Sequence, residues 1–277
     1  MAEPISQREY WAGKVGNEWA TQATRLDIML QPMTDAAMER AGLKSGERVL
    51  DIDCSAGATS LEIARRVAPG AVTGVDISPP LLSVARERAA QSGLAASFVE
   101  ADAGAATFDQ PFDAAFSRFG VMFFEDPTRA FTHIRTTLRA NGRLTFICWC
   151  PLLENGWATA PIAAVMPMLK APLTPPDPDA PGPFAFSNPQ KVERVLGESG
   201  WRDVSITRWD GGILIGGGGT LEEAAEFLLT IGPGARAIAE QNLDHAEARR
   251  RVVEQLSPHG AQDAKLPAAC WIVSATA

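Results

Sequence analysis

The sequence predicts an α/β fold built on one seven-stranded, mostly parallel sheet, with helices on both faces and an antiparallel last strand. Three observations lead to this prediction. Segments with strand and helix patterns alternate along residues 47–150, most of the strand segments are apolar on both faces, and several of them end in an acidic residue. Alternating elements with doubly apolar strands are typical of a parallel sheet that is covered on each side. The fold class is therefore Rossmann-like, and ligands of such sheets bind beyond the carboxyl ends of the strands.

The first half of the chain supplies five strands and three helices. Proline and glycine mark their limits, since Pro69-Gly70 stops the first helix and Pro79 opens the second. We expect strands over 48–53, 71–76, 96–101, 112–117 and 142–149, and helices over 59–67, 79–91 and 127–139. Together these elements make residues 47–150 the ligand-binding core.

The remaining segments are expected to cover and complete this core. Residues 1–46 are amphipathic and form a helical cap, while residues 151–187 contain a run too rich in proline for a helix or an inner strand and form a lid. Residues 188–277 are the C-terminal part of the core. In that part we expect a helix up to Glu198, strands over 204–209 and 270–276, and between them a helical insertion at 211–267 with helices over 221–231 and 235–256.

Composition and charge exclude several function classes. The chain has 25 Lys plus Arg against 33 Asp plus Glu, a formal charge of −8, and no local basic patch, so we expect no nucleic-acid partner. No stretch approaches the roughly 18 apolar residues that a bilayer span needs. The four cysteines are few and unpatterned, which indicates free thiols, a cytoplasmic protein and no metal site.

Acidic residues at three successive strand ends indicate a nucleoside pocket. The loop that ends at Gly57 is made of small residues, which let a ligand approach the backbone N–H groups at the start of the next helix. Asp76 ends the second strand, where an acid can accept hydrogen bonds from both ribose hydroxyls. Asp102 follows the third strand and can meet an adenine amino group. Asp51 and Asp53 are expected to point the same way, which favours a cationic ligand over a dinucleotide pyrophosphate.

These segments resemble the class I S-adenosylmethionine-dependent methyltransferases, in particular small-molecule enzymes of the ubiquinone/menaquinone-biosynthesis type. That family's first motif usually reads Val-Leu-Asp-x-Gly-x-Gly-x-Gly and corresponds to Val49–Gly57, so Asp53 and Ser55 replace two glycines. Residues 72–78, 100–103, 112–124 and 138–144 resemble its later motifs. The resemblance implies S-adenosyl-L-methionine as cofactor, held by Asp51, Asp53, Cys54, Ser55, Ala56, Gly57, Asp76, Ile77, Asp102, Ala103, Ser117, Arg118 and Phe119.

The resemblance further implies in-line methyl transfer to a small-molecule acceptor, driven by positioning. Aromatic and apolar residues near the later strand ends favour an apolar or aromatic acceptor, and its predicted contacts are Met122, Phe123, Trp149, Trp157 and Phe184. We assign no catalytic base, because His133, His245, His259 and Glu154 are interpreted as surface residues.

Two alternatives stay open at this stage. The replaced glycines are also compatible with a binding or regulatory protein of the same fold that has lost cofactor binding or catalysis. In the N-terminal segment, Tyr10, Trp11 and Trp19 either close over the cofactor or pack helices together.

Overall fold

A computed structural model of the protein describes residues 6–173, 177 and 180–277. Seven strands form one sheet in the order β3-β2-β1-β4-β5-β7-β6, and β7 runs antiparallel to both of its neighbours. The predicted fold class is confirmed. The strands are β1 Arg48–Ile52, β2 Ala71–Asp76, β3 Ala96–Glu100, β4 Phe112–Arg118, β5 Leu138–Trp149, β6 Arg202–Leu214 and β7 Lys265–Thr276.

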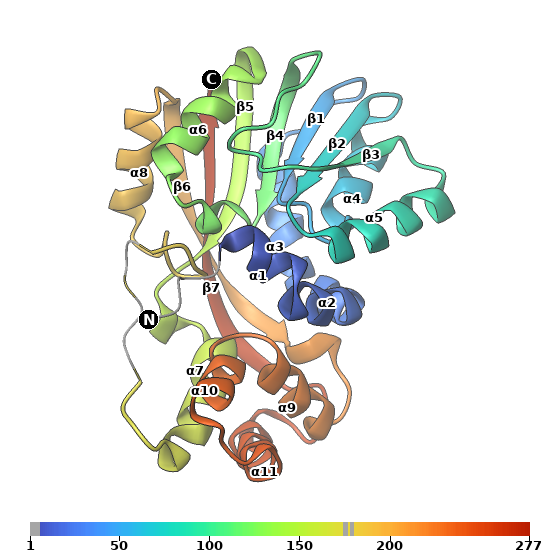
Figure 1. Ribbon diagram of the computed structural model, residues 1–277. Helices are drawn as coiled ribbons and strands as arrows, with labels where there is room; N and C mark the ends of the chain where they lie inside the picture. The colour runs from blue at the N-terminus through green and yellow to red at the C-terminus, as the bar shows by residue number, and fades with distance from the viewer. Residues whose placement is uncertain (1–5, 174–176, 178–179) are drawn as a thin grey trace.

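Helices cover both faces of the sheet. On one face α3 packs against α4 and the last three strands, and on the other face α6 packs against α8. A separate group of helices, α7, α9, α10 and α11, lies beyond one end of the sheet, where β6 and β7 run out to meet it (Figure 1). The helices are α1 Gln7–Ala12, α2 Lys14–Thr21, α3 Ala23–Ala41, α4 Ala58–Val67, α5 Pro79–Ser92, α6 Pro127–Thr136, α7 Gly156–Val165, α8 Pro189–Glu198, α9 Leu221–Thr230, α10 Pro233–Gln241 and α11 His245–Leu256.

The inner strands are buried on both faces, as their composition predicts. Val49, Leu50 and Ile52 of β1 are fully buried, as is Phe116 of the neighbouring β4. Each fully buried aliphatic or aromatic side chain contributes about 2 kcal/mol to folding. Burial of this kind fixes the register of the sheet and brings the ends of β1, β2, β3 and β4 to one edge.

The helix expected over 127–139 is shorter than predicted. It ends at Thr136, and β5 begins at Leu138, which pairs with Phe112 of β4. The backbone N–H of Phe112 also donates to the carbonyl of Thr137 at 2.9 Å. Leu138 has a side chain that suits a helix, but its pairing with Phe112 gives its backbone groups partners in the sheet.

The helix expected over 235–256 is two helices. Asn242 adopts a left-handed backbone with φ 47° and ends α10, and the Asp244 carboxylate then accepts from the backbone N–H of Glu247 at 2.7 Å to begin α11. Asn and Asp are the residues that favour these two positions.

The last two strands extend into the segment 211–267 that was expected to be a helical insertion. β6 continues to Leu214 and β7 begins at Lys265, so only residues 215–264 lie between them. Pro267 falls within β7, which proline tolerates because β5 pairs with β7 only from Cys270 onward, leaving one neighbour at Pro267.

Candidate cofactor site

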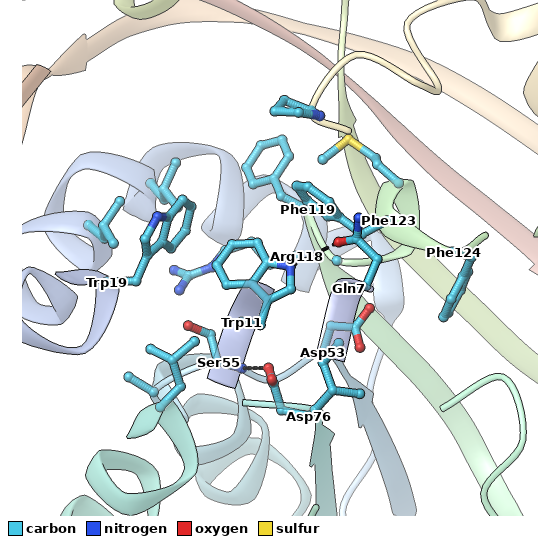
Figure 2. Close-up of a pocket in the computed structure, with 18 of the residues that line it drawn as sticks. Gln7, Trp11, Trp19, Asp53, Ser55, Asp76, Arg118, Phe119, Phe123 and Phe124 are labelled. Carbon is cyan, nitrogen blue, oxygen red and sulfur yellow. Dashed lines mark hydrogen bonds between the residues drawn. The ribbon is translucent and has the colours of Figure 1, made fainter. Parts of the chain in front are cut away.

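A cavity of about 300 Å³ lies at the edge of the sheet where β1, β2 and β4 end. That volume is at the lower end of the range for small-molecule sites. Of the predicted cofactor-binding residues, the cavity wall contains Asp53, Ser55, Ala56, Asp76, Ile77, Asp102, Arg118 and Phe119. Behind the wall, buried in the fold, lie Asp51, Cys54, Gly57, Ala103 and Ser117. Figure 2 shows Asp53, Ser55 and Asp76 together on the floor of this cavity.

The loop after β1 keeps a glycine-like backbone although two of its three glycine positions carry side chains. Asp53, Ser55 and Gly57 all have positive φ angles, of 52°, 53° and 79°. Asp tolerates this region better than most residues. At Gly57 no side chain would fit, because a Cβ atom would lie 2.8 Å from the Cβ of Ala85 in α5. The loop therefore turns as the family motif does, and it carries two extra polar groups.

Asp76 both holds this loop and faces the cavity. Its carboxylate accepts from the backbone N–H of Ser55 at 2.8 Å (Figure 2). It also accepts from the backbone N–H of Ser78 at 2.8 Å. Burial raises its pKa to about 6, although these N–H donors oppose the shift. Each carboxylate oxygen has two lone pairs. Asp76 can thus accept two further hydrogen bonds from a ligand diol.

Asp51 and Asp53 do not face the cavity together, so that expectation is wrong. Asp51 is fully buried and accepts from the Thr59 hydroxyl at 2.7 Å and the Ser60 hydroxyl at 2.5 Å, at the start of α4. Burial raises its pKa to about 6. The strand ends at Ile52, so the alternation that would have aligned the two acids does not reach Asp53.

Asp53 is the acid of this loop that faces the cavity. Its pKa lies well above the usual range, because the carboxyl is desolvated and because Asp76, Asp102 and Asp51 surround it with negative charge. Within the described part of the chain, no hydrogen-bond donor or cation contacts its carboxyl group. The carboxyl packs against Gly120, the second residue after β4.

Arg118 brings a positive charge to the same wall but shares it with Asp27 of α3. Its guanidinium donates to Asp27 Oδ1 at 2.8 Å, and Arg88 of α5 donates to Asp27 Oδ2 at 2.9 Å and to the carbonyl of Ala56 at 3.0 Å. The side chain of Arg118 is 8% exposed. This network ties α3 and α5 to the loop after β1.

The predicted acceptor residues form a continuous aromatic wall on the other side of the cavity. The Phe119 and Trp149 rings stack with centroids 4.0 Å apart, Trp149 contacts Trp157, and Phe184 stacks on Trp157. Met122, Phe123, Trp149 and Trp157 line the cavity, whereas Phe184 lies behind Trp157. Of the proline-rich lid, Pro183 reaches the wall, while residues 174–176 and 178–179 lie outside the described residues.

Sequence reasoning missed part of this wall. Phe227, Leu228 and Ile231 of the α9 region line the cavity, and so do Leu26 and Met29 of α3. Their spacing indicates apolar helix faces, and such a face can either pack in the core or line a cavity. No signal in the sequence distinguishes packing in the core from lining the cavity.

The N-terminal aromatic residues both pack helices and cover the cavity. Trp11 and Trp19 line it, and their rings meet edge to face with centroids 5.2 Å apart. Trp11 also meets Phe123 in the same geometry, at 5.5 Å. Tyr10 is 46% exposed and is not part of the wall.

Part of this chain is similar to known proteins. A family model described as a methyltransferase domain matches residues 49–142. An uncharacterised protein of Mycobacterium tuberculosis is 32% identical over 171 residues, or 61% of this chain and 62% of its own length. Demethylmenaquinone methyltransferase of Thermus thermophilus is 38% identical over 117 residues, or 42% of this chain and 53% of its own length.

Residues 49–142 are thus similar to a methyltransferase domain, and the resemblance to the class I S-adenosylmethionine-dependent methyltransferases extends to a named relative. The chain spans less than two thirds of the length of these curated relatives. A solved structure of Haemonchus contortus phosphoethanolamine N-methyltransferase 2, in complex with phosphomonomethylethanolamine and S-adenosylhomocysteine, has the same fold. The TM-score is 0.61 at 18% identity, covering 100% of this chain and 61% of that one.

No histidine of the described residues lines the cavity. His133 is hydrogen-bonded to the carbonyl of Ala106 at 2.7 Å, His245 lies 3.5 Å from Glu226, and the carboxylate of Glu154 pairs with Arg208. None of these residues lines the cavity among the described residues, so the catalytic base stays unassigned. The described residues also hold no group of His, Cys, Asp and Glu suited to a metal ion.

Gly120 leaves the space that the Asp53 side chain occupies, and a stability measurement can test this packing. A Cβ atom on Gly120 would lie 2.2 Å from the Cβ of Asp53, although the Gly120 backbone itself (φ −92°) suits alanine. Gly120→Ala should therefore lower the free energy of unfolding by about 2 kcal/mol, the usual cost of overpacking. Urea unfolding measures this loss.

The Asp53→Gly background supplies the control, because it removes the atoms that the new methyl group meets. In that background Gly120→Ala should cost less than about 0.5 kcal/mol, which gives a coupling energy well outside the range for independent sites. An equal cost in both backgrounds would show that the two residues do not compete for the same space.

Proposed function

We propose that this chain is an enzyme that transfers a methyl group from S-adenosyl-L-methionine to a small, apolar or aromatic acceptor. The observation that carries the proposal is a single cavity with a backbone-held Asp76 on one side and an aromatic wall on the other. When bound, the cofactor supplies an electrophilic methyl group on its sulfonium. The similarity to a methyltransferase domain and the names of the relatives support the same reaction.

The residues present fit the cofactor. Asp76 would accept from the ribose hydroxyls with its spare lone pairs, and Asp102, whose carboxylate already accepts from the backbone N–H of Gly104 at 2.7 Å, would lie at the adenine end. The wall carries acidic side chains near the loop, where a cationic ligand is stabilised by Coulomb attraction. The loop backbone at Ser55 and Ala56 leaves room for close approach.

The acceptor side would act by positioning and by excluding water. Phe119, Trp149 and Trp157 present ring faces and edges, which favour a flat apolar acceptor over a phosphorylated one. Arg118, which also lines the cavity, is already neutralised by Asp27. Holding the acceptor atom in line with the methyl group supplies most of the rate enhancement for such a displacement. In this proposal, residues 1–46 act as the cap and residues 151–187 as the lid over the ligand-binding core.

Ligand titration and an activity assay test the proposal in two steps. Isothermal calorimetry should show binding of S-adenosylmethionine and of S-adenosylhomocysteine in the micromolar range and no binding of NAD. Labelled methyl transfer should then favour quinol and phenol acceptors over phosphoethanolamine. Binding without transfer to any acceptor of either class would support a non-catalytic binding protein instead, and absence of binding at millimolar ligand would contradict the proposed cofactor.

A further inference from the structure

The order of the strands places Asp53 opposite a particular part of a nucleoside ligand. Asp102 follows β3, Asp76 ends β2 and Asp53 follows β1, and these three strands are neighbours in that order along the sheet. Beyond Asp53 come β4 and β5 with Phe119 and Trp149. If Asp102 lies at adenine and Asp76 at ribose, the 5′ substituent of the nucleoside extends past Asp53 towards the aromatic wall.

Asp53 reaches this position because of its backbone and its neighbour. The left-handed φ of 52° turns its side chain away from the direction that β1 would give it, and the absence of a side chain on Gly120 leaves room for the carboxyl. The carboxyl then faces the cavity without a donor or a cation from any described residue. Among the described residues, three arginines line the cavity, namely Arg8, Arg118 and Arg129. Arg118 is held by Asp27 and Thr34. Arg8 pairs with Glu100.

A partly buried carboxyl without a counter-ion is unfavourable in its charged form. Its negative neighbours Asp76 and Asp102 add to this cost. A ligand that brings a positive charge to the same spot removes the penalty, whereas a neutral ligand does not. The family's usual first motif has glycine here, so this preference depends on a side chain that the usual motif lacks.

We propose that Asp53 is a specificity residue that recognises the positive charge in the 5′ substituent of the cofactor. The inference rests on the proposed function. It predicts that the pocket selects cationic nucleosides over neutral ones through one carboxylate. The positive charge is that of the sulfonium or that of the α-ammonium group, and three probes separate them: S-adenosylmethionine has both charges, S-adenosylhomocysteine has only the ammonium, and 5′-methylthioadenosine has neither.

Calorimetry of wild type and Asp53→Asn with these probes tests the inference. Asparagine tolerates the same backbone region and keeps the shape of the side chain while removing its charge. S-adenosylmethionine should bind the variant at least about 10-fold more weakly, as expected for a lost charge-assisted interaction. Binding of 5′-methylthioadenosine should change by less than about twofold. A parallel loss for S-adenosylhomocysteine assigns the charge to the ammonium group, and an unchanged value assigns it to the sulfonium.

Two further variants keep the test decisive. Glu87→Gln removes the same charge from an exposed position on α5, outside the cavity wall, and it should alter no affinity by more than about twofold. Asp53→Gly restores the family residue and should repeat the Asn result if Asp53→Asn folds poorly. An unchanged or tighter affinity for S-adenosylmethionine, or an equal loss for 5′-methylthioadenosine, overturns this inference alone. Failure of the wild type to bind any probe overturns it together with the proposed function.

Discussion

Replacing Asp76 with asparagine should weaken the binding of S-adenosylmethionine and of 5′-methylthioadenosine alike, by about 100-fold or more. The carboxylate accepts from the N–H groups of Ser55 and Ser78, and in the proposed site it also accepts from both ribose hydroxyls. Asparagine has one acceptor oxygen, so one backbone N–H loses its partner and the charge-assisted bonds to the ligand weaken. Calorimetry with the two nucleosides measures the loss, and it separates this residue from Asp53, whose removal should spare the neutral ligand.

Asp113→Asn provides a matched control for this variant. Asp113 also accepts a hydrogen bond from a backbone N–H, that of Arg48 in the neighbouring strand β1, at 2.8 Å. It lies at the start of β4, away from the cavity. This control should lose stability without losing affinity. If Asp76→Asn kept its affinity for both nucleosides, the ribose assignment would be wrong. Some loss of stability is expected for Asp76→Asn as well, because its carboxylate holds the loop after β1.

The Asp27→Asn variant should lower the free energy of unfolding by about 3 kcal/mol. Asp27 lies between two guanidinium groups, with Arg118 at 2.8 Å and Arg88 at 2.9 Å, and Arg118 is almost fully buried. Removing one member of a buried ion pair leaves an uncompensated charge, which costs several kcal/mol. Urea unfolding at neutral pH gives the loss directly.

The control is an exposed acid that also lies beside two basic side chains. Glu226 lies near Arg249 and His245 with about half of its side chain exposed, so Glu226→Gln should cost less than about 1 kcal/mol. A similarly small cost for Asp27→Asn would mean that water solvates Arg118 through the cavity. The network would then contribute to the shape of the wall and little to stability.

The sequence was sufficient to predict the sheet and the main polar residues of the site. Strands such as β1 are apolar on both faces, and a doubly buried strand has few other interpretations. Asp76 could be found because a parallel sheet brings the carboxyl ends of its strands to one edge. Both predictions depend on patterns within short segments of sequence, and the contacts in the folded protein favour the same structure as these patterns.

Other features depend on partners that lie far away in the chain. The direction of Asp53 follows from the end of β1 at Ile52 and from the space at Gly120, which lies 67 positions further along. Leu138 begins β5 because Phe112 of β4 offers it a partner. Phe227 faces the cavity because β6 and β7 carry its helix there, and its own sequence context shows only an apolar helix face.

The extension of β6 and β7 beyond the sheet has an evolutionary consequence. Residues 215–264 enter and leave through this two-stranded ribbon (Figure 1). They supply Phe227, Leu228 and Ile231 to the lining of the cavity. The loop at 49–57, which the proposed function assigns to the cofactor, is encoded in a different stretch. In that proposal, exchanging the ribbon-borne module between homologues would diversify what is alkylated and leave the cofactor loop unchanged.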